Sequence, residues 1–158
     1  MHEAYATRWV NARDFLVHRA GFPGFFGDLF DHLGYSRPDI IHRIRFVKPG
    51  YSFRDHPEYS NIGFFLAGEM AAAAGGAPFE EIVRSRIFEP LGMKRSGVAS
   101  VLFADDDNIS RSHAGKEGAL RVVPSNLSAV FIAAGGLASS ASDLSDYLVM
   151  LANGGESG

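Results

Sequence analysis

A tyrosine and an asparagine stand one residue apart in "HPEYSNIGFFLAG" (residues 56–68), where a polar turn passes into an apolar stretch. Tyr59 offers a phenol, whose reference pKa of about 10 lets it act as a base near neutrality only beside a positive group. Asn61 offers a side-chain oxygen that accepts hydrogen bonds from the free amides of a helix start. Tyr59 is therefore a candidate base. The alternative is an aromatic packing residue followed by an N-cap.

Other reactive groups are scarce. The chain has no cysteine, which excludes thiolate nucleophiles, disulfides and zinc sites of the CxxC kind. A serine nucleophile needs a nearby base and donors for the oxyanion, and no GxSxG motif occurs. We interpret Ser139 and Ser140 as helix-capping residues. The six histidines show no HExxH or paired spacing, so neither a metal ion nor a cofactor is expected.

The segment after Tyr59 predicts the clearest helix of the chain. Apolar residues at helical spacing predict a helix over residues 62–74, and Gly75 and Gly76 end it. A second helix is predicted from Pro78 to Pro90. The predicted apolar face of the first helix contains Ile62, Phe65, Leu66, Met70 and Ala73, and that of the second contains Phe79, Ile82, Val83 and Ile87.

Three further helices are predicted from capping signals. Asn11 opens a short helix that extends to His18, and Pro38 begins another that extends to Arg43. Ser140, with Asp143 at capping-box spacing, opens a last helix that ends before Gly154. Its predicted apolar stripe contains Leu144, Tyr147, Leu148 and Leu151. Residues 97–126 are predicted to be irregular, with a solvated acidic loop at 105–107 and one short strand at 120–123, so the chain is expected to be mainly α.

Composition narrows the choice of partners. The chain has 158 residues, 46% of them apolar, and a formal net charge of -3 from 15 basic and 18 acidic residues without a basic stripe. Nucleic acid is therefore not an expected partner. The most apolar run, residues 62–74, would form a helix of about 20 Å, shorter than the roughly 30 Å core of a bilayer. No membrane span is expected, and the charged first 21 residues do not fit a signal peptide. The absence of cysteine leaves the compartment open.

Four blocks occur in a recognisable order: "RDFLVHRAGFPG" (13–24), "YSNIGFFLAGE" (59–69), "RIFEPLGMKRS" (86–96) and "AAGGLASSASDLSDYL" (133–148). Together they resemble serine β-lactamases and penicillin-binding-protein-like hydrolases, specifically the branch of class C β-lactamases, DD-peptidases and esterases. The resemblance implies that Tyr59 and Asn61 are the catalytic YxN motif. It also implies that His18 and Arg19 fix a loop, and that "AAGGLASS" forms a close-approach turn bordering the site.

Two other catalytic motifs of the family have no match. No lysine follows a serine in SxxK, and none begins KTG: Lys48, Lys94 and Lys116 are preceded three positions earlier by Arg45, Leu91 and His113. The "HAG" at 113–115 has the letters of HxG, but it precedes the glycine-rich block that this motif follows in the family. We reject that match. The lysine would supply the charge that Tyr59 needs, so the tyrosine is expected to be an ordinary protonated phenol. Approach of Lys48 or Arg54 is the less favoured alternative.

These observations give one expectation for the fold and three for the function. Residues 1–158 are expected to form a single partial domain, the isolated helical lobe of the α+β β-lactamase/transpeptidase-like fold. The first functional hypothesis is an incomplete serine hydrolase, inactive alone, whose complete parent would cleave β-lactams, D-Ala peptides or esters through an acyl-serine. The second is a non-enzymatic module that forms homo-oligomers through exposed apolar helix faces. The third is one half of a split serine hydrolase, active only on mixing with its partner.

Overall fold

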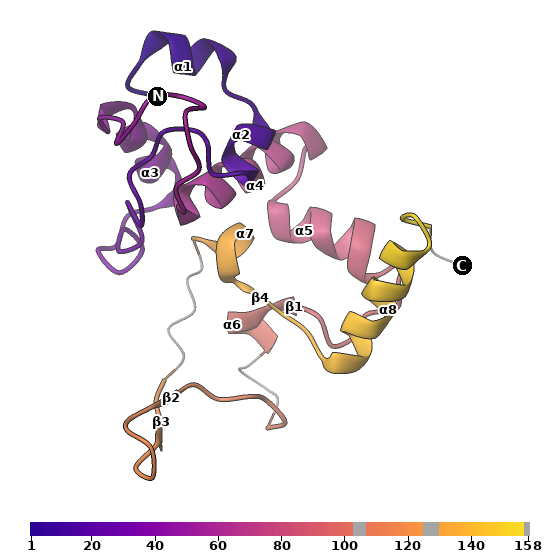
Figure 1. Ribbon diagram of the computed structural model, residues 1–158. Helices are drawn as coiled ribbons and strands as arrows, with labels where there is room; N and C mark the ends of the chain where they lie inside the picture. Colours follow the sequence, from indigo (N-terminus) through magenta and orange to yellow (C-terminus); the bar gives the residue numbers. More distant parts are fainter. Residues whose placement is uncertain (103–106, 125–129, 157–158) are drawn as a thin grey trace.

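The computed structural model describes residues 1–102, 107–124 and 130–156, and most of its regular structure is helical (Figure 1). The strands among these residues are two residues long, so the expectation of a mainly α chain with a few short strands is confirmed for the part described. The helices are α1 (Ala4–Trp9), α2 (Ala12–Leu16), α3 (Arg37–Arg43), the 3-10 helix η1 (Ile44–Phe46), α4 (Asn61–Gly75), α5 (Phe79–Val83), the π-helical η2 (Arg84–Phe88), α6 (Ala99–Leu102), α7 (Ile132–Gly135) and α8 (Ala141–Ala152).

Local capping signals begin two of the predicted helices. The side chain of Asn11 accepts hydrogen bonds from the backbone of Arg13 and Asp14, and Asp14 completes a capping box for α2. Ser36 does the same for α3, with Asp39 as its partner. The prediction that the helix opened by Asn11 extends to His18 is wrong. It ends at Leu16, because His18 has a positive φ of 59° that no α-helix accommodates.

Helix α4 confirms the predicted central helix, and Gly76 ends it with a φ of 69°. Its predicted apolar face is partly wrong: Met70 is 42% exposed and Ala73 is also exposed. The helix is apolar nearly all round, so periodicity alone does not select the buried side. The buried side of α4 keeps the predicted Ile62, Phe65 and Leu66 and adds two glycines. Its buried residues are Ile62, Gly63, Phe65, Leu66 and Gly68.

The main core lies where α2, α3 and α4 meet the segment of α7. Phe15 of α2 stacks on Phe22 with ring centroids 6.3 Å apart, and Phe65 of α4 meets Phe131 edge to face at 5.4 Å. Removing these rings from water supplies the dominant stabilisation. The buried cluster consists of Phe15, Ala20, Phe22, Ile40, Ile44, Ile62, Phe65, Leu66 and Phe131.

The predicted second helix is confirmed as α5 followed without interruption by η2, where one extra residue per turn widens the helix. Its axis is bent by 72° from that of α4. Among the described residues no single helix is long and apolar enough to cross a membrane. The pair formed by α4 and residues 79–88 passes the same test of length and composition only when its two bent halves are taken together.

Two small antiparallel strand pairs complete the described structure. β1 (Gly97–Val98) pairs with β4 (Leu137–Ala138), and β2 (His113–Ala114) pairs with β3 (Arg121–Val122). The strand predicted at 120–123 is therefore confirmed over its central residues. The hairpin of β2 and β3 projects away from the helices in Figure 1.

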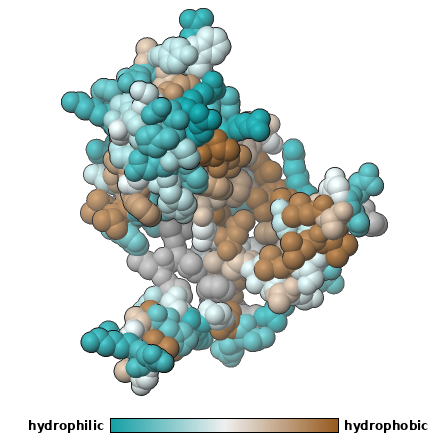
Figure 2. All heavy atoms as spheres, in the orientation of Figure 1, coloured by the Kyte–Doolittle hydropathy of each residue, from teal (hydrophilic) through white to brown (hydrophobic). Residues whose placement is uncertain are grey.

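Helix α8 is the predicted last helix, and its apolar residues remain largely uncovered. Leu144, Leu148 and Leu151 are 48%, 61% and 51% exposed. Between α8, β4 and the α5–η2 helix lies an apolar groove of 420 Å³. Figure 2 shows hydrophobic residues gathered over this side of the molecule, where Figure 1 places α5 and α8. The groove is lined by Phe79, Val83, Ile87, Phe88, Met93, Leu137, Ala138, Ser139, Leu144 and Tyr147.

Candidate active site

Tyr59 and Asn61 lie together at the start of α4. The Tyr59 hydroxyl donates a hydrogen bond of 2.9 Å to Oδ1 of Asn61, and the tyrosine is 50% exposed. The interpretation of Asn61 as an N-cap is wrong, because the N-cap position belongs to Ser60 and Asn61 is the first helical residue. The Asn61 oxygen faces the phenol instead. The pair thus forms one polar unit on an accessible surface.

Ser60 occupies the cap position without capping. Its side chain accepts no hydrogen bond from the first turn of α4, and Ser60 is only 2% exposed. Its Oγ has no hydrogen-bond partner among the described residues. A buried hydroxyl without a partner is costly, so this side chain is held by its neighbours rather than by its own bonding.

The loop after α2 fixes the backbone around Tyr59. The amide of Phe25 donates to the Tyr59 carbonyl at 3.1 Å, and the amide of Glu58 donates to the His18 carbonyl at 3.0 Å. The rings of His18 and Phe25 lie 4.9 and 5.6 Å from the Tyr59 ring. His18 thus belongs to a segment that contacts residues 58 and 59, just before α4.

Arg54, one of the two residues considered as a positive neighbour for Tyr59, is engaged elsewhere. Its guanidinium donates to both carboxylate oxygens of Asp14, at 2.7 and 2.8 Å, and to the Trp9 carbonyl at 3.0 Å. Hydrogen bonding to Arg54 lowers the pKa of the Asp14 carboxyl below its ordinary value, and the same contact raises the pKa of Arg54. Sequence patterns did not reveal this pair. The opposite charges of Asp14 and Arg54 were the only sequence signal for this pair, because no fixed spacing connects residues so far apart.

Ser140 caps α8, as the sequence predicted, and its Oγ accepts from the Asp143 amide at 3.2 Å. The reciprocal half of the predicted capping box is not formed. The Asp143 carboxylate accepts instead from the Arg95 amide and the Ser96 hydroxyl, both at 2.7 Å. Burial alone would raise the pKa of the Asp143 carboxyl, but these hydrogen bonds outweigh burial and lower that pKa. An aspartate held in this way is a weak base.

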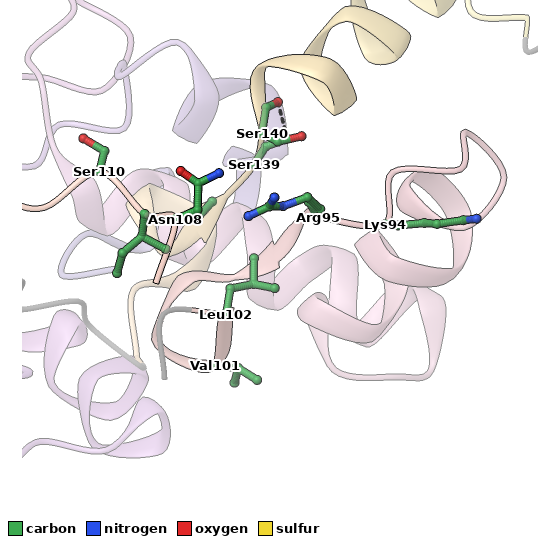
Figure 3. Close-up of a pocket in the computed structure, with 10 residues that line it drawn as sticks. Lys94, Arg95, Val101, Leu102, Asn108, Ser110, Ser139 and Ser140 are labelled. Atoms are coloured by element: carbon green, nitrogen blue, oxygen red, sulfur yellow. Dashed lines mark hydrogen bonds between the residues drawn. The ribbon is translucent and has the colours of Figure 1, made fainter. Parts of the chain in front are cut away.

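Ser139 lies beside this cluster, with its Oγ 2.6 Å from that of Ser96. Ser139 and Ser140 also border a cavity of 420 Å³, shown in Figure 3, to which Lys94, Arg95 and Asn108 contribute. The Ser139 hydroxyl contacts the Ser96 hydroxyl, which donates a hydrogen bond to the ionised Asp143. Among the described residues, no histidine or lysine is hydrogen-bonded to Ser139. The N-cap of α8 is Ser140, so the interpretation of Ser139 as a helix-capping residue is wrong, and its hydroxyl contacts Ser96 and the Ser140 carbonyl instead.

The remaining sequence candidates come from later parts of the chain. His113 and Ala114 form β2 on the projecting hairpin, where both are exposed, which agrees with the rejection of "HAG". Of the acidic loop predicted at 105–107, Asp105 and Asp106 lie outside the described residues, and Asp107 is exposed. In the "AAGGLASS" turn, a Cβ on Gly136 would lie 2.6 Å from the Cα of Ile132, so this is a close-approach turn. Across residues 1–102, 107–124 and 130–156, no group of three or more possible metal ligands is found.

Comparison with known proteins identifies the family to which the chain belongs. The sequence model of the family described as Beta-lactamase matches residues 3–158, and the chain therefore belongs to the β-lactamase family. Gigasin-6 of Magallana gigas is 27% identical over 118 residues, which make up 75% of this chain and 39% of that protein.

Solved structures of related proteins share the fold. The octameric penicillin-binding protein homologue of Pyrococcus abyssi is 30% identical with a TM-score of 0.71, over 94% of this chain and 36% of its own. The D-amino acid amidase of Ochrobactrum anthropi SV3, complexed with L-phenylalanine amide, is 25% identical with a TM-score of 0.66, over 94% and 47%. A class C β-lactamase is 22% identical with a TM-score of 0.75, over 98% and 41%. The chain thus spans less than half the length of these relatives.

Proposed function

We propose that residues 1–158 are an incomplete serine-hydrolase domain, the helical lobe of the β-lactamase/transpeptidase-like fold, which is catalytically silent alone. The complete parent would cleave a β-lactam, a D-amino acid peptide or amide, or an ester through an acyl-serine. Tyr59 would carry protons as the base of that reaction, and Asn61 would orient the substrate amide or the lysine. The observation that carries the proposal is the hydrogen bond from Tyr59 to Asn61 in a chain without an SxxK lysine.

The hydrogen bonding of Tyr59 and Asn61 supports the proposed lack of catalytic activity. A phenol bonded to a neutral amide oxygen gains no positive charge that would stabilise its phenolate, and Arg54 gives its hydrogen bonds to Asp14 and Trp9. Without a base, no serine in reach is activated. Tyr59 and Asn61 therefore hold a catalytic geometry without the nucleophile that it would serve.

The test is an assay of the pure chain with a chromogenic cephalosporin and a short p-nitrophenyl ester. We expect no turnover above that of heat-inactivated protein, and no mass increase by intact mass spectrometry after incubation with the cephalosporin. Tyr59→Phe serves as the control for background hydrolysis by surface groups. Turnover that the wild-type chain shows and the Tyr59→Phe variant loses would contradict the proposal.

A second candidate function, self-association, is favoured by the uncovered apolar surface. The groove beside α8 and the exposed leucines of α8 form a continuous apolar region of the kind that drives association. A second copy of the chain fits this region because it carries both the exposed leucines of α8 and the groove that would receive them. We expect a mass above that of the monomer by light scattering at micromolar concentration, and a monomeric mass would count against this function.

A further inference from the structure

His18 holds an unusual backbone conformation at the point where the loop after α2 meets the start of α4. Its φ of 59° lies in the left-handed region that residues with a side chain seldom adopt. Its amide donates to the Phe15 carbonyl at 3.1 Å, and its carbonyl accepts from the Glu58 amide at 3.0 Å. The surrounding backbone therefore requires this conformation, and it aims the imidazole at residues 59–64.

The imidazole makes one directed bond and two ring contacts there. Nδ1 of His18 accepts a hydrogen bond of 3.3 Å from the Ser60 amide. The ring lies 4.9 Å from that of Tyr59 and 5.4 Å from that of Phe64, tilted by 44° and 39°. A backbone amide is only a donor, so Nδ1 carries no proton in this arrangement and the neutral ring has its hydrogen on Nε2.

The contacts of His18 affect the positions of Tyr59 and Asn61, the two residues that flank Ser60. The Tyr59 ring is half exposed, and His18 and Phe25 are its ring neighbours among the described residues. Ser60 does not cap α4 with its own side chain, so the bond from its amide to His18 fixes this turn from outside the helix, together with the bond from the Phe25 amide to the Tyr59 carbonyl. Losing the imidazole would free both the turn and one face of the phenol.

We propose that His18, as the Nε2-protonated neutral imidazole, is the positioning residue of the Tyr59–Asn61 pair. It fixes the pair through the Ser60 amide and through ring contact with Tyr59. The functional meaning of this role rests on the function proposed for Tyr59 and Asn61, but its geometry does not. A structural readout therefore separates the two: turnover by the pure chain that Tyr59→Phe abolishes would refute the proposed silence and leave the positioning role intact.

Three substitutions divide the role of His18 into its parts. His18→Gly keeps the left-handed backbone and removes both ring and acceptor. His18→Asn tolerates the same backbone and keeps an acceptor oxygen near the position of Nδ1, without the ring. His18→Phe keeps a ring and removes the acceptor. The readouts are the NMR resonances of the Tyr59 ring, the Ser60 amide and the Asn61 side-chain amide, with the methyl groups of Ile132 as a distant control.

In the wild-type chain, we expect the nitrogen spectrum of His18 to show an unprotonated Nδ1. His18→Gly should move all three readouts, with the Tyr59 ring shifting toward its value in a free peptide and Ile132 unchanged. His18→Asn should restore the Ser60 amide alone, and His18→Phe should restore the Tyr59 ring alone. A protonated Nδ1, or Tyr59 and Asn61 resonances that stay unchanged in the glycine and asparagine variants, would overturn the proposal. If the glycine variant fails to fold, the asparagine variant decides.

Discussion

The Asp14 carboxylate and the Arg54 guanidinium are joined by two hydrogen bonds, of 2.7 and 2.8 Å, across a sequence separation of 40 residues. Asp14 also accepts a third bond, of 3.0 Å, from the Asn11 amide that begins α2. One buried carboxylate therefore holds a helix start and connects it to the segment that leads to Tyr59. This connection makes Asp14 a sensitive position for both stability and its dependence on pH.

Asp14→Asn should destabilise the chain at neutral pH, and the difference from wild type should shrink as the solution becomes acidic. The pKa of Asp14 is lowered in the folded state, chiefly by its hydrogen bond with Arg54. The stabilisation is therefore fully present above the ordinary aspartate pKa of about 4 and is lost as pH falls through the lower folded value. Urea unfolding from pH 7 down to pH 3 measures this gap. The exposed Asp146, replaced by asparagine, is the control, and a gap independent of pH would contradict the assignment.

Ser140→Ala should destabilise the chain and Ser60→Ala should not, although both serines occupy N-cap positions. The Ser60 hydroxyl is buried without a partner, so its removal should be neutral or stabilise the chain by up to about 1 kcal/mol. The Ser140 hydroxyl accepts the Asp143 amide, so its removal should cost about 1 kcal/mol. Thermal or urea unfolding of the two variants side by side measures this difference. Equal losses would mean that Ser60 has a partner after all.

Gly63→Ala should force α4 away from α2. A Cβ at Gly63 would lie 2.8 Å from the Phe15 carbonyl oxygen, which is backbone and has little room to move. We expect a loss of about 1–3 kcal/mol in the free energy of unfolding. Gly135→Ala, where a Cβ would meet nothing within 4 Å, should change stability by less than about 0.5 kcal/mol. Denaturant unfolding compares them, and an unaffected Gly63→Ala variant would disprove the close approach.

Leu148→Glu should weaken self-association. Leu148 is 61% exposed on α8, and a charge there would have to be desolvated when a second copy covers the apolar region. We expect at least a tenfold rise in the dissociation constant, about 1.4 kcal/mol. Leu33→Glu is the matched control, because Leu33 is 68% exposed in the loop that precedes α3. Analytical ultracentrifugation gives both constants, and equal effects of the two substitutions would indicate nonspecific association.

The parts of the fold that sequence reasoning found depend on signals carried within a few residues. Asn11, Pro38, Gly76 and Ser140 each mark a helix end by their own backbone preference or side-chain bonding. The helix α1 lacks such a signal, since its N-cap Glu3 makes no side-chain cap bond, and it was not predicted. Local chemistry thus defines where α2, α3 and α8 begin and where α4 ends.

The features that were missed depend on partners distant in the sequence. β1 and β4 pair across about forty residues, and each is only two residues long, too short to show an alternating pattern. The cap position at Ser60 was assigned to Asn61 because both residue types favour caps, and the extended backbone of Ser60, with φ of -150° and ψ of 123°, distinguishes them. At the candidate site, the YxN motif identified Tyr59 and Asn61 from the sequence. The residues that surround them lie in the loop after α2, and no sequence pattern predicted those contacts.

The segment between Arg19 and Arg54 is closed at its base. The Arg54 amide donates to the Arg19 carbonyl at 3.0 Å, and the Gly50 amide donates to the Gly21 carbonyl at 3.0 Å, so the chain returns to the place it left. Changes in length near the exposed tip at Leu33 and Gly34 would be absorbed inside this closed segment. Descendants of this sequence could therefore change the length of this segment by insertion or deletion while inheriting the position of the tyrosine unchanged.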